Sequence, residues 1–249
     1  MRMAIDRSIP AKRFASSTAK QQMLRQLICS DAPEQALRHR GATLIAGVDE
    51  VGRGALFGPV VAAAVILPRN LTSLAKGGLT DSKQLKQTHR ESLNATIRKM
   101  AIAVCVAEID AETIDRVNIY QATRLAMLAA VNGLEVAPDH LLIDAMLINH
   151  SCAQTKLIYG DSLSLSIAAA SVVAKVYRDN LMCQCDTVHP QYGFASHKGY
   201  GTVQHRLALQ KFGPLPEHRR SFAPVGASTE SLFGDGELNS ENSEAIAWA

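Results

Sequence analysis

The longest uninterrupted apolar segment of the chain spans residues 60–67 and reads VVAAAVIL. A helix that crosses a bilayer needs about 20 consecutive apolar residues, so we expect no transmembrane helix and no membrane partner. A segment of this length, with several β-branched residues, is instead typical of a buried β-strand. The chain has 249 residues, of which 47% are hydrophobic, so we expect one large domain, or one domain with a small appendage, folded around a sizeable core.

Strand-length apolar segments alternate with longer segments of helical periodicity. We predict strands over residues 44–48, 60–67, 102–109, 140–143 and 157–159, and helices over residues 84–100, 119–131, 166–183 and 202–212. Residues 81–83 supply N-cap candidates for the first of these helices, and Thr202 and Gly213 suit the start and end of the last. This order indicates an α/β fold with a mixed sheet flanked by helices, followed by a C-terminal helical region.

The two ends of the chain differ in charge from its middle. Residues 1–41 carry eight Lys or Arg and three acidic residues, whereas residues 228–249 carry five acidic residues and no basic one. We therefore predict a basic, partly disordered N-terminal extension over residues 1–41, a folded domain over residues 42–227 and an acidic, disordered tail over residues 228–249. The extension lacks the apolar segment of a secretory signal, and a transit peptide is the alternative to a solvated or helical extension.

Cysteine count and net charge limit the compartment and the partners of the chain. Five cysteines, an odd number in a chain of this size, argue against a disulfide scaffold and for a reducing compartment. We therefore expect a cytoplasmic location. The net charge of +3 permits a polyanionic partner without requiring one.

Acidic residues follow two of the predicted strands. Asp49 and Glu50 follow the first strand, Asp144 follows the fourth, and Asp161 precedes a helix. If the four carboxylates meet at one edge of the sheet, they form the oxygen-rich site that a hard divalent cation prefers. Because neighbours in a strand point to opposite faces, Glu50 has to reach around the strand end to join Asp49. Taken singly, the acidic pair is explained by a solvated turn and Asp161 by a helix cap.

Residues 46–59, AGVDEVGRGALFGP, join the acidic pair to a glycine-rich turn. This segment resembles the hallmark motif of the type 2 ribonuclease H (ribonuclease HII) family. Further segments match the family in the same order: residues 81–83 (DSK), 118–120 (NIY), 142–144 (LID), 160–162 (GDS), 168–176 (AAASVVAKV), 178–179 (RD), 189–194 (HPQYGF), 197–200 (HKGY) and 218–222 (HRRSF). The resemblance spans roughly residues 44–225 and does not cover the two ends.

The resemblance implies a ribonuclease H-like fold and endonucleolytic cleavage. It implies hydrolysis of the RNA strand of RNA–DNA hybrids, incision at single ribonucleotides in duplex DNA, and dependence on Mg²⁺ or Mn²⁺. The family's catalytic carboxylates fall on Asp49, Glu50, Asp144 and Asp161. We expect Asp49 and Asp144 to be the main ligands of two metal ions, with Glu50 and Asp161 completing a shell or orienting the water. The expected product ends are a 3′-hydroxyl and a 5′-phosphate.

Substrate recognition is expected from a loop, a tyrosine and basic residues. The resemblance implies that Gly52, Arg53, Gly54 and Tyr200 read the junction between RNA and DNA, where the 2′-hydroxyl distinguishes the ribose. The candidates for phosphate contacts are Lys83, Lys175, Arg178, Lys198, Arg219 and Arg220. Taken alone, the loop is explained by a flexible turn, the tyrosine by a half-buried aromatic, and each basic residue by a solvated charge.

Three positions depart from the family pattern. Ala55 stands where the family usually has Pro, Tyr159 where a Lys commonly precedes Gly-Asp, and Ala145 where a Gly usually follows the acid. Two other functions stay open: a type 3 ribonuclease H acting on long hybrids, and a non-catalytic hybrid-binding module. The type 3 family carries a larger N-terminal domain than residues 1–41 can form. We expect a monomer, and the sequence identifies no replication or repair partner.

Overall fold

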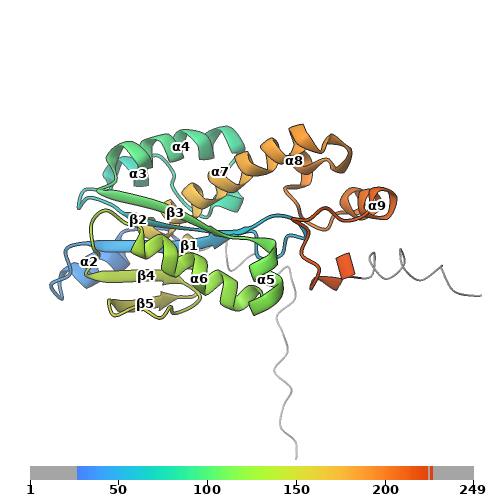
Figure 1. Cartoon of the computed structure of the whole chain (residues 1–249). Coiled ribbons are helices and arrows are strands. Elements are labelled where there is room, and N and C mark those ends of the chain that lie inside the picture. Colours follow the sequence, from blue (N-terminus) through green and yellow to red (C-terminus); the bar gives the residue numbers. More distant parts are fainter. Residues whose placement is uncertain (1–26, 224, 227–249) are drawn as a thin grey trace, which may run out of the picture.

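A five-stranded mixed sheet lies at the centre of the computed structural model, which describes residues 27–223 and 225–226 (Figure 1). The order of the strands in the sheet is β3-β2-β1-β4-β5. Pairing is antiparallel between β1 and β2 and between β2 and β3, and parallel between β1 and β4 and between β4 and β5. The strands are β1 (Ile45–Val51), β2 (Val60–Ile66), β3 (Ala103–Ile109), β4 (His140–Asp144) and β5 (Ala153–Leu157). The predicted α/β fold with a mixed sheet is therefore confirmed.

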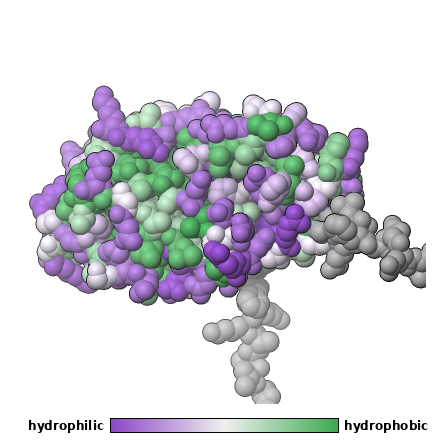
Figure 2. Space-filling model, in the orientation of Figure 1, coloured by the Kyte–Doolittle hydropathy of each residue, from purple (hydrophilic) through white to green (hydrophobic). Residues whose placement is uncertain are grey.

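Helices cover both faces of this sheet. Helix α6 (Ile119–Asn132) lies on one face with α5 (Ala111–Val117) beside it, and the surface over this layer mixes polar and apolar side chains (Figures 1 and 2). The long helix α7 (Leu165–Val188) crosses the other face together with α3 (Thr72–Lys76) and α4 (Gln87–Met100). The sheet therefore separates two apolar cores.

Alternation along the strands decides which core each side chain enters. Ala46 and Val48 of β1 pack in the core under α6, whereas Val61 of β2 packs in the core under α7. Gly47 faces α7 so closely that a Cβ atom there would overlap the backbone of Ser166. Helix α7 can therefore lie directly on β1, which brings its polar residues next to the acidic end of that strand.

The C-terminal region forms a third apolar cluster beside the sheet. Phe57, in the loop after β1, stacks on Phe194 with ring centroids 3.9 Å apart. Isolated β-bridges join Ala55 to Tyr200 and Phe57 to His218, so this region is attached to the loop that follows the acidic pair. Its elements are η3 (Pro190–Tyr192), α8 (Phe194–His197) and α9 (Val203–Phe212). The predicted C-terminal helical region is confirmed.

Helix α2 (Ala32–Arg38) lies inside the segment predicted as an N-terminal extension. Its Glu34 is fully buried and accepts hydrogen bonds from the Ser164 hydroxyl (2.6 Å) and the Ser166 amide (2.8 Å) at the start of α7. This part of the segment is thus packed on the domain. Residues 1–26 and 227–249 lie outside the described residues, so the predicted disorder of both ends, and the domain boundary at residue 42, stay predictions.

Several predicted boundaries are wrong. The first strand extends to Val51, so Asp49 and Glu50 lie inside β1 and do not follow it, and the helix predicted over residues 166–183 extends to Val188.

Two further boundaries differ for local reasons. The fifth strand spans Ala153–Leu157 rather than residues 157–159, because this edge strand mixes polar with apolar residues and has no apolar run. Helix α4 begins at Gln87 rather than at residue 84, because Asp81 instead caps the turn η1 (Ser82–Gln84) by accepting a hydrogen bond from the Lys83 amide (2.9 Å). Among the described residues, no helix is both long enough and apolar enough to cross a membrane.

Candidate active site

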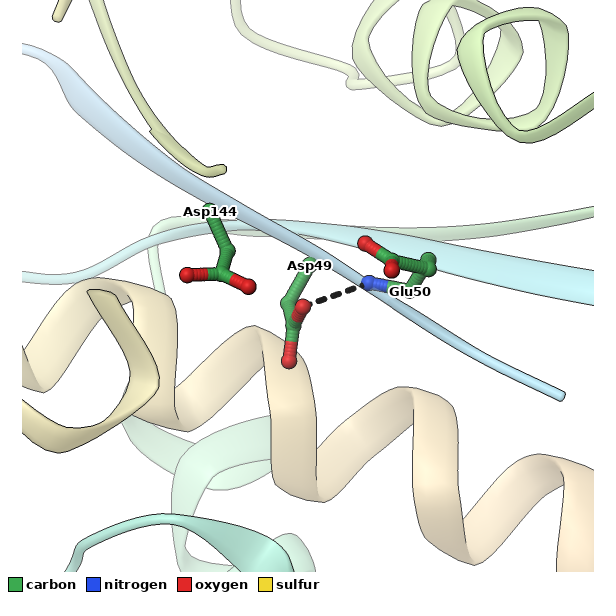
Figure 3. A group of neighbouring side chains, drawn as sticks. All are labelled: Asp49, Glu50 and Asp144. Carbon is green, nitrogen blue, oxygen red and sulfur yellow. Dashed lines mark hydrogen bonds between the residues drawn. The ribbon is translucent and has the colours of Figure 1, made fainter. Parts of the chain in front are cut away.

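Acidic side chains gather where the two central parallel strands end. Asp49 and Glu50 lie near the end of β1, and Asp144 is the last residue of β4. Because β1 and β4 are parallel neighbours, their carboxyl ends meet at the same edge of the sheet. Figure 3 shows the three side chains directed toward a common space. Asp161 lies nearby in the turn η2 (Gly160–Ser162), which follows β5.

The spacing of three of these carboxylates suits a shared cation. One oxygen atom each of Asp49, Glu50 and Asp144 lies within 4.8 Å of the other two. Glu50 meets the others because its side chain bends toward Asp144, while its amide donates a hydrogen bond to Asp49 Oδ1 (2.7 Å; Figure 3). Asp161 is outside this group, and its carboxylate lies 3.8 Å from the ammonium of Lys83. The structure therefore brings three of the four predicted acids together and places the fourth beside them.

Neighbouring elements hold these acids in place. Asp144 Oδ1 accepts a hydrogen bond from the amide of Gly160 (2.7 Å), which ties the end of β4 to η2. Ser171 of α7 hydrogen-bonds to Asp49, and its hydroxyl lies 2.9 Å from that of Ser82. Sequence reasoning did not single out either serine, because a serine inside a matched motif carries no sign of its partner.

Burial and mutual repulsion make it costly to charge all of these acids at once. Burial, and then the charges of Glu50, Asp144 and Asp161, raise the pKa of Asp49 well above its usual value. Burial also raises the pKa of Glu50, against the opposing effect of Arg53 at 3.3 Å, and it raises the pKa of Asp144. Burial and neighbouring acids raise the pKa of Asp161 to about 6. A positive charge bound among these acids would therefore lower their pKa values and offset their repulsion.

The donor set fits a hard divalent cation. Glu50 Oε2 is buried and has no hydrogen-bond partner among the described residues. A buried carboxylate oxygen in that condition is costly, and a cation among the acids would offer it a partner and offset the repulsion. Because the donors are carboxylate oxygens without thiolate or imidazole, Asp49, Glu50 and Asp144 are suited to hold Mg²⁺ or Mn²⁺.

An open cavity of about 430 Å³ lies beside the acids. Glu50 lines one side, and residues 52–54 and Tyr200 line another. Lys83 and Lys175 also line this cavity, so it combines an acid, a glycine-rich loop, an aromatic ring and basic side chains. These are the chemical features that a phosphate- and sugar-bearing ligand requires. The ammonium of Lys175 is paired with Asp179 (2.6 Å), so its predicted phosphate contact stays a prediction.

Lys198 and Arg220, two of the predicted phosphate contacts, lie outside the lining of this cavity. The ammonium of Lys198 lies 3.1 Å from the Sγ atom of Cys183. The side chain of Arg220 is exposed, and its backbone amide donates to Asp115 (2.8 Å). Phosphate contacts by Lys198 and Arg220 stay predictions.

The prediction of a direct phosphate contact needs correction for two buried arginines. Arg219 is fully buried and donates to the carbonyls of Arg53 and Gly58, each at 3.0 Å. Arg178 is also fully buried and donates to the carbonyl of Phe57 (3.0 Å). Both guanidinium groups therefore support the loop after β1 from its inner side. Since both side chains are fully buried, neither is at the surface that a phosphate can reach.

Comparisons with known proteins agree with this geometry. The family model described as Ribonuclease HII matches residues 46–225. A ribonuclease HII of Koribacter versatilis is 52% identical over 214 residues, which are 86% of this chain and 83% of the relative.

Solved structures show the same fold at lower identity. The ribonuclease H2 of Pyrococcus horikoshii OT3 superposes with a TM-score of 0.68 at 22% identity, over 77% of this chain and 99% of that one. A Bst-RNase HIII solved in complex with Mn²⁺ superposes with a TM-score of 0.62 at 20% identity, over 86% of this chain and 81% of that one. On the extent of the family match and the identity to its relatives, the chain belongs to the ribonuclease HII family.

Proposed function

We propose that this chain, a metal-dependent endoribonuclease by its family, cleaves the RNA strand of RNA–DNA hybrids and also incises duplex DNA at single ribonucleotides. One observation carries the proposal. Asp49, Glu50 and Asp144 converge, and the buried Oε2 atom of Glu50 has no hydrogen-bond partner among the residues that the structure describes; Glu50 also lines a cavity together with residues 52–54 and Tyr200. A polyanionic substrate with a 2′-hydroxyl is the ligand that uses both halves of this arrangement.

The acids supply the hydrolytic half of the site. Two bound divalent cations would activate water for in-line attack and offset the charge of the scissile phosphate and the leaving oxygen. Asp49 and Asp144 are the main ligands, since their strands end side by side. Glu50 and Asp161 complete the coordination or orient the water. Because water attacks in place of the 2′-hydroxyl, the products carry 3′-hydroxyl and 5′-phosphate ends.

The loop and the tyrosine supply recognition. Gly54 is exposed and has open surroundings, so the loop backbone can come close to a sugar there, whereas the buried Gly52, with a left-handed φ of +89°, lies against the side chain of Arg178. The bridge between Ala55 and Tyr200 keeps this loop and the tyrosine at a constant separation. We infer that the loop binds the 2′-hydroxyl while the Tyr200 ring stacks on the following sugar–base unit. Arg219 acts through the loop and does not contact the substrate.

The test uses a duplex DNA with one ribonucleotide and, separately, a long RNA–DNA hybrid, each with Mg²⁺ or Mn²⁺. We expect incision of both. Tyr200→Ala is expected to lower kcat/KM for the single ribonucleotide by about tenfold or more, the equivalent of one lost stacking contact, with folding retained. Tyr120→Ala, which removes an exposed tyrosine on α6, is the matched control and is expected to cleave like the wild type.

Each other outcome points to a different function. Cleavage of long hybrids alone would favour the type 3 activity. Binding without incision of either substrate would favour the non-catalytic module. Wild-type incision by Tyr200→Ala would overturn the role of the ring while leaving the hydrolytic site intact.

A further inference from the structure

Three histidines form a buried cluster in the C-terminal region, away from the carboxylates. His205 of α9 is fully buried, and His218 and His197 are 1% and 8% exposed. His197 stacks on His205 with ring centroids 4.5 Å apart, and Phe194 packs edge-on against His205 at 5.5 Å. His197 and His205 hydrogen-bond to the backbone of Gly199 and Tyr200, so the cluster supports the part of the cavity wall that Tyr200 forms.

The partners of two rings determine where their protons lie. The amide of Leu215 donates to Nδ1 of His218 (2.8 Å), so this nitrogen carries no proton and the proton of a neutral ring is on Nε2. Nδ1 of His205 lies 3.1 Å from the carbonyl oxygen of Tyr200. A carbonyl only accepts, so Nδ1 of His205 is protonated and its Nε2 is bare.

These two assignments agree at the atoms where the rings meet. Nε2 of His218 lies 3.1 Å from Nε2 of His205. The protonated nitrogen of the first ring therefore faces the bare nitrogen of the second. The result is one directed chain of hydrogen bonds, from the Leu215 amide through both rings to the Tyr200 carbonyl, in which each ring has a single permitted tautomer.

The same cluster fixes the residues just before the tyrosine. His197 accepts a hydrogen bond at Nδ1 from the amide of Gly199 (3.2 Å) and donates from Nε2 to the carbonyl of Tyr192 (2.8 Å). Gly199 has a left-handed φ of +79°, and a Cβ atom there would lie 2.8 Å from the carbonyl oxygen of Phe57. The backbone leading to Tyr200 is therefore pressed against the loop after β1 and is held there from below by histidine rings.

We infer that His218 and His205 are positioning residues that hold the Tyr200 carbonyl, and through it the ring at the cavity wall, by a single directed hydrogen-bond chain. Neither residue touches the cavity or the acids. The inference rests on the proposed function only in giving Tyr200 a role in recognition. The chain of proton positions stands on the geometry alone.

The surroundings keep both rings neutral. Burial, with the nearby charge of His197, lowers the pKa of His205 to about 4. Burial, followed by the charges of His205, Arg220 and His189, lowers the pKa of His218 to about 3. All of these neighbours repel an added proton. Protonation of either ring would set two donors against each other, at Leu215 or between the rings, so the chain exists only while both are neutral.

Imidazole ¹⁵N–¹H correlation spectra of the full-length protein at neutral pH test the proton positions without any substrate. We expect one ring protonated at Nδ1 (His205) and one protonated at Nε2 whose Nδ1 accepts a hydrogen bond (His218), neither of which titrates between pH 5.5 and 8. The signal assigned to Nδ1–H is expected to disappear in His205→Asn. Rings that exchange between tautomers, or that titrate near pH 6.5, would overturn the inference.

A thermodynamic cycle with Tyr200→Ala tests the positioning role. We expect His205→Leu to raise KM for the single-ribonucleotide duplex by about tenfold with little change in kcat, which corresponds to one lost hydrogen bond. His205→Asn, whose amide reaches the Tyr200 carbonyl like Nδ1, is expected to restore most of the loss. In the Tyr200→Ala background, His205→Leu is expected to add less than about twofold, because the residue acts through the tyrosine.

The control is His140→Leu, a half-buried histidine of β4 that hydrogen-bonds to Thr155 and is expected to leave KM unchanged. Equal losses from His205→Leu with and without Tyr200 would show that His205 acts elsewhere and would overturn the inference. If His205→Leu does not fold, the cycle is run with His218→Asn, which can still accept from the Leu215 amide but lacks the Nε2 atom that meets His205, and the spectra of the wild type decide the proton positions. If Tyr200→Ala alone has no effect, the proposed recognition fails while the tautomer chain is still decided by the spectra.

Discussion

The carboxylate cluster at the end of β1 and the histidine cluster of the C-terminal region are both buried groups of titratable side chains, but they differ in how completely their atoms are paired. All six ring nitrogens of His197, His205 and His218 have a hydrogen-bond partner. Among the acids, Glu50 Oε2 has none within the described residues, and burial and neighbouring charges raise the pKa of Asp49.

This difference in hydrogen-bond pairing distinguishes a site that is suited to bind a ligand from a structural cluster whose polar atoms are already all paired. An unpaired buried oxygen costs free energy until something supplies its partner, whereas a fully paired cluster needs nothing further. The first cluster is therefore suited to a cation, whereas the second, as we infer, holds Tyr200 in place. The two meet at the cavity, where Glu50 and Tyr200 line the same space.

The largest effect is expected from a substitution in the carboxylate cluster, at Asp49. Asp49→Asn removes a ligand charge and keeps the shape, so we expect cleavage to fall by about 10³-fold, the equivalent of several kcal/mol of transition-state stabilisation. Hybrid binding and the unfolding midpoint are expected to survive, as measured by fluorescence anisotropy and circular dichroism. The control is Asp139→Asn, at the residue just before β4, which is expected to cleave normally. A variant that no longer folds would make Asp49 a structural acid.

The next largest effect is the stabilisation of the fold by divalent ions, which should depend on the carboxylate cluster and not on the histidine cluster. At 100 times the dissociation constant, Mg²⁺ or Mn²⁺ is expected to raise the free energy of unfolding by about 2.7 kcal/mol, and a chelator to reverse this. Asp49→Asn is expected to be more stable than the wild type in the chelator, because one repelling charge is gone, and to respond less to metal. His205→Asn is expected to respond fully. Equal responses of Asp49→Asn and the wild type in thermal unfolding would contradict the metal assignment.

The convergence of the acids could be predicted because it depends on strand ends. The apolar run before Asp49 and the run that ends at Asp144 mark two strands, and parallel neighbours end at one edge of a sheet. The place of Asp161 could not be predicted in the same way. It follows the polar edge strand β5, and Tyr159 and Gly160 turn the chain before it, so its distance to Lys83 depends on the turn.

The histidine cluster could not be predicted from the sequence. His205 and His218 are 13 positions apart, and their partners outside the pair are a carbonyl at Tyr200 and an amide at Leu215. The direction of such backbone groups depends on turns such as that at Lys198, a non-glycine residue with a left-handed φ of +53°. The family resemblance marked two of the three histidines as motif residues, but a motif does not indicate where a proton lies.

Acid should weaken the fold through the histidine cluster. The pKa values of His205 and His218 are about 4 and about 3 in the folded protein, below the usual value near 6.5, so the unfolded chain binds more protons in between. Stability contributed by the pair is therefore complete above about pH 6.5 and is lost as the pH falls toward 4, by up to about 1.4 kcal/mol per pH unit for each histidine. His205→Asn should make this slope shallower in urea unfolding, whereas His89→Asn, at an exposed site, should not. Parallel slopes for the wild type and His205→Asn would contradict the assignment.

The smallest expected effect concerns Lys83, the cation beside the carboxylate cluster. Burial alone would lower the pKa of Lys83, but the nearby charges of the acids Asp81, Asp161, Asp49 and Asp144 raise it above its usual value. The side chain of Lys83 is 79% exposed. It is therefore a charged group that can leave an acid for a phosphate.

In an Asp49→Asn background, which binds without cutting, Lys83→Ala should weaken hybrid binding a few-fold and reduce the slope of log K against log salt by about 1. Lys99→Ala, at the exposed C-terminal end of α4, is the matched loss of charge and should leave that slope unchanged. If both variants change the slope equally, Lys83 contributes only to the general field of the protein. If neither variant changes the slope, the role of Lys83 is to neutralise Asp161. The ammonium of Lys83 then supplies to the acids part of the positive charge that a bound metal ion would otherwise supply.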